Sequence, residues 1–142
     1  MLKELLTQEI VVAMKNKDQL KKGMLQLMKA NIENLEIKEK RALTKDEEIS
    51  IIQREVKQTK EALSEAEKYS RQDLVDENKR KLEILSAYLP EQLSAEEVKE
   101  ALIEAGVNSE MNMGQAMKVA MGALKGKAEN KLISTTVKEL LS

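Results

Sequence analysis

The fold of this chain is decided at Tyr88-Leu89-Pro90-Glu91-Gln92-Leu93-Ser94, which contains the only proline in 142 residues. Proline lacks the backbone N–H that a helix interior requires, and it disfavours helical geometry at the residue before it. The residues before Pro90 show the pattern of long helices, and those after it show the pattern of short ones. We therefore expect an all-α protein in which Pro90 is a hinge between two helical domains, residues 1–89 and 90–142.

The composition favours helices and excludes several kinds of site. Charged residues make up 35% of the chain, and there is no Trp or Phe and only two Tyr, so aliphatic side chains and eight Met have to fill the core. The absence of Cys and His excludes disulfides, thiolate chemistry and histidine ligands or bases. A Ser–Lys pair remains compatible with the composition, but no spacing points to one. We expect no catalytic residue, no cofactor and no metal site.

The net charge of −1 points to no particular partner, and no run of apolar residues approaches the length of about 18 that a membrane span requires. The N-terminus lacks the pattern of a signal peptide. We expect a soluble, cytoplasmic protein with no membrane partner.

The first two helices are predicted over residues 2–16 and from Asp18, as N-cap, to Arg41. Val11 and Val12 widen the apolar face of the first helix, which predicts that it is covered on more than one side. The predicted core positions recur at helical spacing: Leu2, Leu6, Ile10, Ala13 and Met14 in the first helix, and Leu20, Met24, Leu27, Met28, Asn31 and Leu35 in the second.

The next two helices are predicted to form an antiparallel hairpin. Thr44 and Glu47 form a capping box, in which each side chain accepts from the other residue's backbone N–H, and Ser70 is the expected cap of the fourth helix. Apolar positions alternate at spacings of three and four, which is typical of a narrow coiled-coil-like seam. The seam residues are Ile49, Ile52, Val56, Thr59, Leu63 and Ala66, then Val75, Asn78, Leu82, Leu85 and Leu89.

Three short helices are predicted after Pro90. Ser94 and Glu97 form a second capping box, and Gly106 is expected to end that helix, which buries Val98, Ala101, Leu102 and Ala105. Ser109 or Asn112 starts the next helix and Gly126 stops it. Its methionines, Met113, Met117 and Met121, with Met111 just before it, have two interpretations: core filling, which we favour, or a plastic binding groove.

A second informative stretch is Leu124-Lys125-Gly126-Lys127-Ala128-Glu129-Asn130-Lys131-Leu132, where one helix ends and another begins. Residues 111–142 carry five Lys against two Glu, a local net charge of +3. Backbone N–H groups at a helix N-terminus suit a phosphate, and flexible lysines add positive charge. The alternative is an ordinary helix–turn–helix corner with solvated lysines.

These stretches, taken in order, resemble the bacterial YqeY family, also called the GatB/YqeY-like proteins. The matching motifs are Met14-Lys15-Asn16-Lys17-Asp18, Leu43-Thr44-Lys45-Asp46-Glu47-Glu48 with Gln53-Arg54-Glu55-Val56-Lys57-Gln58, Tyr88 to Ser94, Met113-Gly114-Gln115-Ala116-Met117, and Lys125 to Leu132. The resemblance implies two helical domains, the second similar to the tail of GatB, the B subunit of the glutamine-dependent tRNA amidotransferase. Carbon–nitrogen ligase activity with glutamine as amido donor is implied only by that kinship, since this chain carries none of the catalytic parts.

Our leading hypothesis is a non-catalytic module that interacts with tRNA or other structured RNA. Its phosphate contacts would be Lys118, Lys125, Lys127 and Lys131, with Gly126 and Asn130 shaping the turn, while the N-terminal hairpin serves as a lever or a protein-docking arm. The alternatives are a protein-interaction adaptor without RNA binding, with a protein partner held through the hairpin, and an accessory to a glutamine-dependent amidotransferase.

Overall fold

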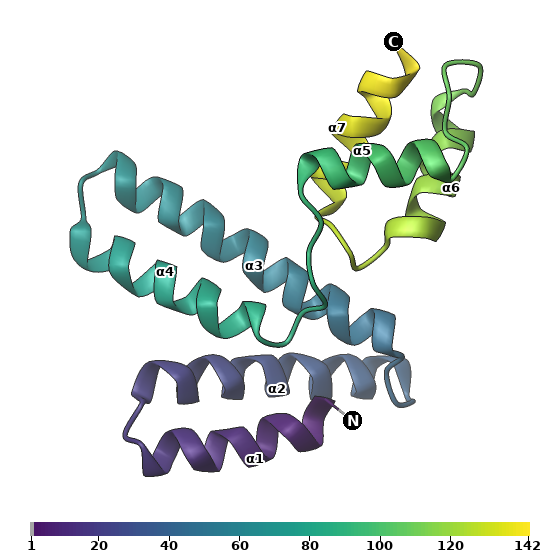
Figure 1. Cartoon of the computed structure of the whole chain (residues 1–142). Coiled ribbons are helices and arrows are strands. Elements are labelled where there is room, and N and C mark those ends of the chain that lie inside the picture. The colour runs from purple at the N-terminus through teal and green to yellow at the C-terminus, as the bar shows by residue number, and fades with distance from the viewer. Residues whose placement is uncertain (1) are drawn as a thin grey trace. The chain divides into compact units, whose positions relative to one another are not determined.

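The computed structural model describes residues 2–142, and every secondary-structure element named in that range is an α-helix (Figure 1). Its chain divides into two compact units, Met1–Leu89 and Pro90–Ser142. The first unit contains α1 (Leu2–Lys15), α2 (Gln19–Glu39), α3 (Lys45–Lys68) and α4 (Gln72–Ser86). The second contains α5 (Ala95–Glu104), α6 (Met113–Leu124) and α7 (Asn130–Leu141). The predicted all-α class is confirmed.

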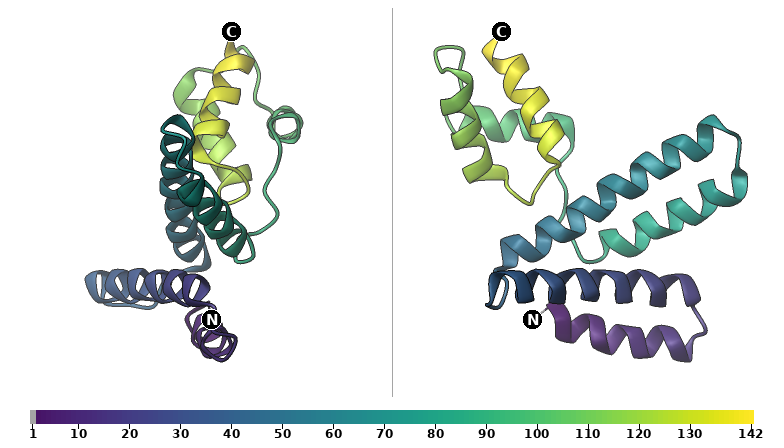
Figure 2. Two further views of the ribbon diagram at one scale, coloured as in Figure 1. Left: turned by 90° about the vertical axis from the view of Figure 1, so that its left-hand side faces the viewer. Right: turned by 180° about the vertical axis from the view of Figure 1, so that it is seen from behind.

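The first unit consists of two helical hairpins, α1–α2 and α3–α4, which run in different directions (Figure 2). Helix α2 connects them, because it packs on α1 and also contacts α3 and α4. Aliphatic side chains from all four helices meet in one core, whose most deeply buried members are Leu6, Leu25, Met28, Ile32, Ile52 and Leu85. The paired helices therefore share one hydrophobic core.

Helix α1 buries only one side. Leu6 and Ala13 are buried as predicted, but Val11, Val12 and Met14 are about half exposed, so the prediction of cover on several sides is wrong. The reason is that α1 packs chiefly on α2, and one neighbouring helix covers only one stripe of a helix surface.

Helix α2 begins as predicted and ends earlier. The Asp18 carboxylate accepts from the backbone N–H of Lys21 at 3.2 Å, which confirms the predicted N-cap. The helix stops at Glu39 because Lys40 takes a left-handed conformation, with φ of 57°. Its core stripe includes Leu25 and Ile32, which sequence reasoning passed over, whereas Leu27 is 42% exposed.

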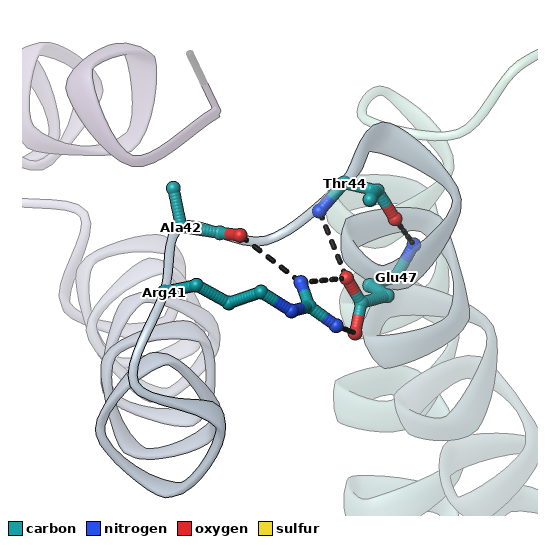
Figure 3. A network of polar contacts seen from close by, with 4 residues as sticks. All are labelled: Arg41, Ala42, Thr44 and Glu47. Carbon is teal, nitrogen blue, oxygen red and sulfur yellow. Dashed lines mark hydrogen bonds and ion pairs between the residues drawn. The ribbon is translucent and has the colours of Figure 1, made fainter.

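A network of polar contacts joins the end of α2 to the start of α3 (Figure 3). The predicted capping box is present: Glu47 N–H donates to Thr44 Oγ1 at 3.2 Å, and Thr44 N–H donates to Glu47 Oε1 at 2.9 Å. The Arg41 guanidinium adds two parallel bonds to the same carboxylate, at 2.7 and 3.0 Å. The Arg41 guanidinium, with the Thr44 N–H, lowers the pKa of Glu47 to about 2. A bidentate pair of this kind fixes orientation as well as distance.

The α3–α4 hairpin confirms the predicted seam, whose positions are buried or partly buried. The exception is Leu89, which was predicted within the fourth helix but lies beyond its end at Ser86. The two polar members of the seam are satisfied within their own helices: Thr59 Oγ1 donates to the Glu55 carbonyl and Asn78 Nδ2 donates to the Leu74 carbonyl, both at 2.8 Å. The predicted cap Ser70 is wrong. Ser70 takes a left-handed conformation and Arg71 occupies the N-cap position.

Polar side chains also connect α1 and the start of α2 to each other, to α4 and to the segment that follows α4. Tyr88 Oη donates to Glu9 Oε2 at 2.8 Å, Lys21 Nζ lies 3.7 Å from the same oxygen, and Arg80 pairs with Asp18. Burial of its side chain is the main cause that raises the pKa of Tyr88, and the hydrogen bond to Glu9 raises it further. Tyr88 thus connects the C-terminal end of the first unit to its first helix.

The second unit packs α5, α6 and α7 around a separate core. The Ser94–Glu97 capping box is confirmed, and Gly106 ends α5 in the expected left-handed conformation, with φ of 98°. Asn112, one of two predicted starts, caps α6 through a reciprocal bond with Gln115. The predicted core residue Ala105 is exposed, because it caps α5 rather than lying within it.

The four methionines, Met111, Met113, Met117 and Met121, are partly buried and pack against this second core. The packing agrees with their interpretation as core-filling side chains. Within residues 2–142, no helix combines the length and the apolar character that a membrane crossing requires.

Candidate nucleic-acid interface

The turn between α6 and α7 places several lysines at one end of the second unit. Helix α6 ends at Leu124, and Gly126 then takes φ of 82°, a conformation in which a side chain would be strained. Lys127 N–H donates to the Leu124 carbonyl at 2.9 Å, which closes the turn. Leu124 and Ala128, at 3% and 1% exposure, anchor it in the core. The positive φ of Gly126 therefore gives the turn its shape.

Two residues of the hinge stretch hold this turn from the other side. Gln92 Nε2 donates to the Gly126 carbonyl at 3.0 Å and to the Pro90 carbonyl at 2.9 Å. Leu93 N–H donates to the Lys127 carbonyl at 2.8 Å. Since these bonds occupy consecutive carbonyl groups of the turn, they hold its backbone in place while leaving the lysine side chains outside.

The four predicted contact lysines, Lys118, Lys125, Lys127 and Lys131, are all exposed. None of them forms an ion pair or a side-chain hydrogen bond with another residue of the described chain. Lys118 lies in α6 and Lys125 is the residue that caps its C-terminus. They are seven positions, or two helical turns, apart, which places their backbones on one side of the helix at about 10 Å from each other. Gly122 lies between them on that face, where it is exposed and an added Cβ would meet nothing within 4 Å. Lys118 and Lys125 thus lie on either side of a helix position that has no side chain.

Lys127 and Lys131 flank the start of α7. Asn130, predicted to shape the turn, is the first residue of α7, and Glu129 occupies the N-cap position. The Glu129 side chain caps none of the first backbone N–H groups of α7. A helix N-terminus carries partial positive charge, which adds to that of the neighbouring lysines. This end of the unit can therefore attract an anion by both charge and hydrogen bonding.

The described residues hold no group of three or more Asp or Glu arranged to bind a metal ion. Three groups with a shifted pKa stabilise the fold: Glu47 and Glu97 belong to capping boxes, and Tyr88, just after α4, donates to Glu9 of α1.

Comparison with known families agrees with this arrangement of motifs. The family model for Yqey-like protein matches residues 3–141, which is nearly the whole chain. The chain belongs to the YqeY family. No curated protein matches it. Membership of the YqeY family thus extends across both units of the structure.

Two residues that hold the α6–α7 turn of this YqeY-family chain, Gln92 and Leu93, were not predicted from the sequence. Both lie in the hinge stretch, and the turn that they hold lies more than 30 residues further along the chain. Pairing between such distant segments leaves no periodic pattern. The only signal available was that both segments carried the resemblance to the family.

Proposed function

We propose that this member of the YqeY family is a non-catalytic RNA-interacting module directed to tRNA, and that its C-terminal unit holds the phosphate backbone. The observation that carries the proposal is the group of four exposed, unpaired lysines at and beside the α6–α7 turn. Such lysines are free to replace the counterions of a polyanion without first breaking a protein contact.

The local charge supports the same conclusion. The chain as a whole has a net charge of −1, whereas residues 111–142 have +3. A positive region on a nearly neutral protein favours approach of a polyanion in one orientation. The resemblance of the C-terminal residues to the GatB tail favours tRNA among RNAs.

Retention of tRNA on filters across a salt series tests the proposal. Four lysine–phosphate contacts predict that log affinity falls against log salt concentration with a slope of about −3 to −4. Replacing Lys118, Lys125, Lys127 and Lys131 with Ala should abolish retention while far-ultraviolet circular dichroism stays unchanged.

The matched control replaces four lysines of the first unit, so that it removes the same charge from a different place. Lys15, Lys17, Lys57 and Lys79 are exposed there and form no ion pair with a described residue. Their replacement with Ala should leave tRNA retention within twofold of wild type. Equal losses in the two variants would indicate nonspecific attraction, and retention by the first variant would contradict the proposed site and favour a protein-interaction adaptor.

A further inference from the structure

A groove in the first unit takes no part in the proposed RNA contact. It has a volume of about 510 Å³ and lies between the second half of α2, residues 27–38, and the middle of α3, residues 51–58. The α3 wall includes Arg54, Glu55 and Gln58. These belong to the motif Gln53 to Gln58, which carried part of the resemblance and has no role in the RNA proposal.

Each wall of the groove is a second face of a helix that already buries its first. On α2 the core face carries Met24, Met28 and Ile32, while the groove residues begin at Leu27 and recur at helical spacing up to Lys38. On α3 the core face carries Ile52 and Val56, and the groove residues lie at 51, 54, 55 and 58. The groove residues of α2 and those of α3 face each other, and a third helix can pack between two such rows of side chains.

Aliphatic side chains give the groove an apolar component. Leu27, Leu35 and Ile51 line it, and Leu27 remains 42% exposed. Ile37, on the same half of α2, is 74% exposed. Covering these side chains with an apolar surface removes them from water, which favours association.

The polar side chains of the groove are available for a partner. Asn31, Asn34 and Gln58 line it as well, and their amide groups form no hydrogen bond to any residue in 2–142. Lys38 stands on the α2 wall and Arg54 on the α3 wall, each without an ion pair in the described chain. Glu55 is the single acidic residue of the lining, so the groove carries net positive charge. A carboxylate placed between the walls would be attracted by both cations.

The two walls of the groove are connected through a network of polar contacts. The bidentate Arg41–Glu47 pair and the capping box fix the corner at which α2 gives way to α3 (Figure 3). A surface that is already in its binding geometry loses less conformational freedom when a partner arrives.

We propose that this groove binds an amphipathic α-helix of a partner protein. The helix would present apolar side chains at i, i+3 or i+4 and i+7 to Leu27, Leu35 and Ile51, and an Asp or Glu to Lys38 and Arg54. The inference stands apart from the RNA proposal, because the two surfaces share no residue.

The test uses the full chain and a display library of helical peptides with one randomised face. Selection on the immobilised protein should enrich peptides with apolar residues at helical spacing and at least one acidic residue beside them. Fluorescence anisotropy with an enriched peptide should show at least a tenfold loss of affinity in the double variant Lys38→Glu, Arg54→Glu. Lys57→Glu, an exposed lysine on another face of α3, is the matched control and should change the affinity less than twofold.

Chemical-shift mapping on the wild-type protein gives a readout that needs no variant. Addition of the peptide should shift amide signals of residues 27–38 and 51–58. The proposal is overturned if no peptide is enriched, if enriched peptides lack acidic residues, or if their shifts map elsewhere. It is also overturned if tRNA shifts the signals of these residues. A dimer in light scattering, with the same signals shifted by self-association, would overturn it as well. The four-lysine variant should bind the peptide normally, so failure of the RNA proposal and failure of this one are distinguishable.

Discussion

Gln92 donates a hydrogen bond from Nε2 to the carbonyl oxygen of Gly126 at 3.0 Å, across 34 positions of sequence. The bond connects the segment at the start of the second unit to the turn that carries the lysines. Leu93 N–H reinforces it by donating to the next carbonyl group, that of Lys127, at 2.8 Å. The position of the lysine-bearing turn therefore depends on residues that immediately follow the only proline.

Removing the Gln92 side chain should loosen this turn. Because one neutral hydrogen bond contributes about 1 kcal/mol, Gln92→Ala should lower the free energy of unfolding of the second unit by about that amount. Hydrogen exchange of α7 amides in the full chain measures the effect locally. Gly126→Ala should cost more, about 1–2 kcal/mol, because alanine is strained at φ of 82°.

Glu91→Ala is the control for both changes, since Glu91 is exposed and forms no hydrogen bond or ion pair with another described residue. Its exchange rates should match those of wild type. If Gln92→Ala exchanged no faster than Glu91→Ala, the Gln92 bond would not stabilise the turn.

The Arg41–Glu47 pair should make the first unit sensitive to acid. The pKa of Glu47 is about 2 in the folded chain, against an ordinary value of 4.5, because Arg41 and the Thr44 N–H favour the carboxylate. A folded pKa below the unfolded one stabilises the protein above about pH 4.5, and this contribution is lost as the pH falls towards 2. The difference in unfolding free energy between wild type and Glu47→Gln should therefore be constant at neutral pH and shrink between pH 4.5 and 2.

Urea unfolding followed by circular dichroism at several pH values measures this difference. Glu97→Gln is the matched control, because Glu97 caps α5 in the same way but has no arginine partner. Hydrogen bonding to Ser94, chiefly to its backbone N–H, lowers the pKa of Glu97. The unfolding free energy difference between wild type and Glu97→Gln should change less with pH than the difference for Glu47→Gln. A Glu47→Gln difference that did not change with pH would mean that the ion pair is not formed in solution.

Tyr88 should ionise later than a free tyrosine. Burial and the hydrogen bond to the Glu9 carboxylate both raise the pKa of Tyr88 above 10. The chain has two tyrosines and no tryptophan, so Tyr69→Phe leaves Tyr88 as the only group that absorbs on ionisation near 295 nm. Its absorbance titration should have a midpoint above 10, and adding Glu9→Gln should lower that midpoint. A midpoint at 10 in both proteins would argue against the Tyr88–Glu9 hydrogen bond.

What could be predicted from the sequence was mainly local. The capping boxes at Thr44–Glu47 and Ser94–Glu97 involve residues three apart, and the hairpin seam is a spacing pattern. Both features could therefore be predicted from the sequence. The exposure of Val11 and Val12 was not, because it depends on how many helices pack around α1. The Gln92–Gly126 bond joins two turns, and turns carry no periodicity from which their contact could be inferred.

The exposed face of α6 offers the sharpest test of the proposed RNA contact. Gly122 lies between Lys118 and Lys125, and a side chain there would meet open space. Gly122→Glu should therefore fold normally, yet it places a carboxylate between the two lysines and opposes an approaching phosphate. We expect tRNA affinity at low salt to fall at least tenfold and the slope of log affinity against log salt to become shallower.

Gly122→Ala separates charge from helix stability. Alanine in a helix interior is more favourable than glycine by about 0.8–1 kcal/mol, so this variant should be more stable than wild type. Because alanine adds no charge and only one carbon atom, tRNA affinity should stay within twofold of wild type. If Gly122→Ala weakened binding as much as Gly122→Glu, the backbone at this position would itself be in contact with RNA. If neither variant changed binding, the Lys118–Lys125 face would take no part in the contact, and any RNA site would have to lie at the α7 end of the turn.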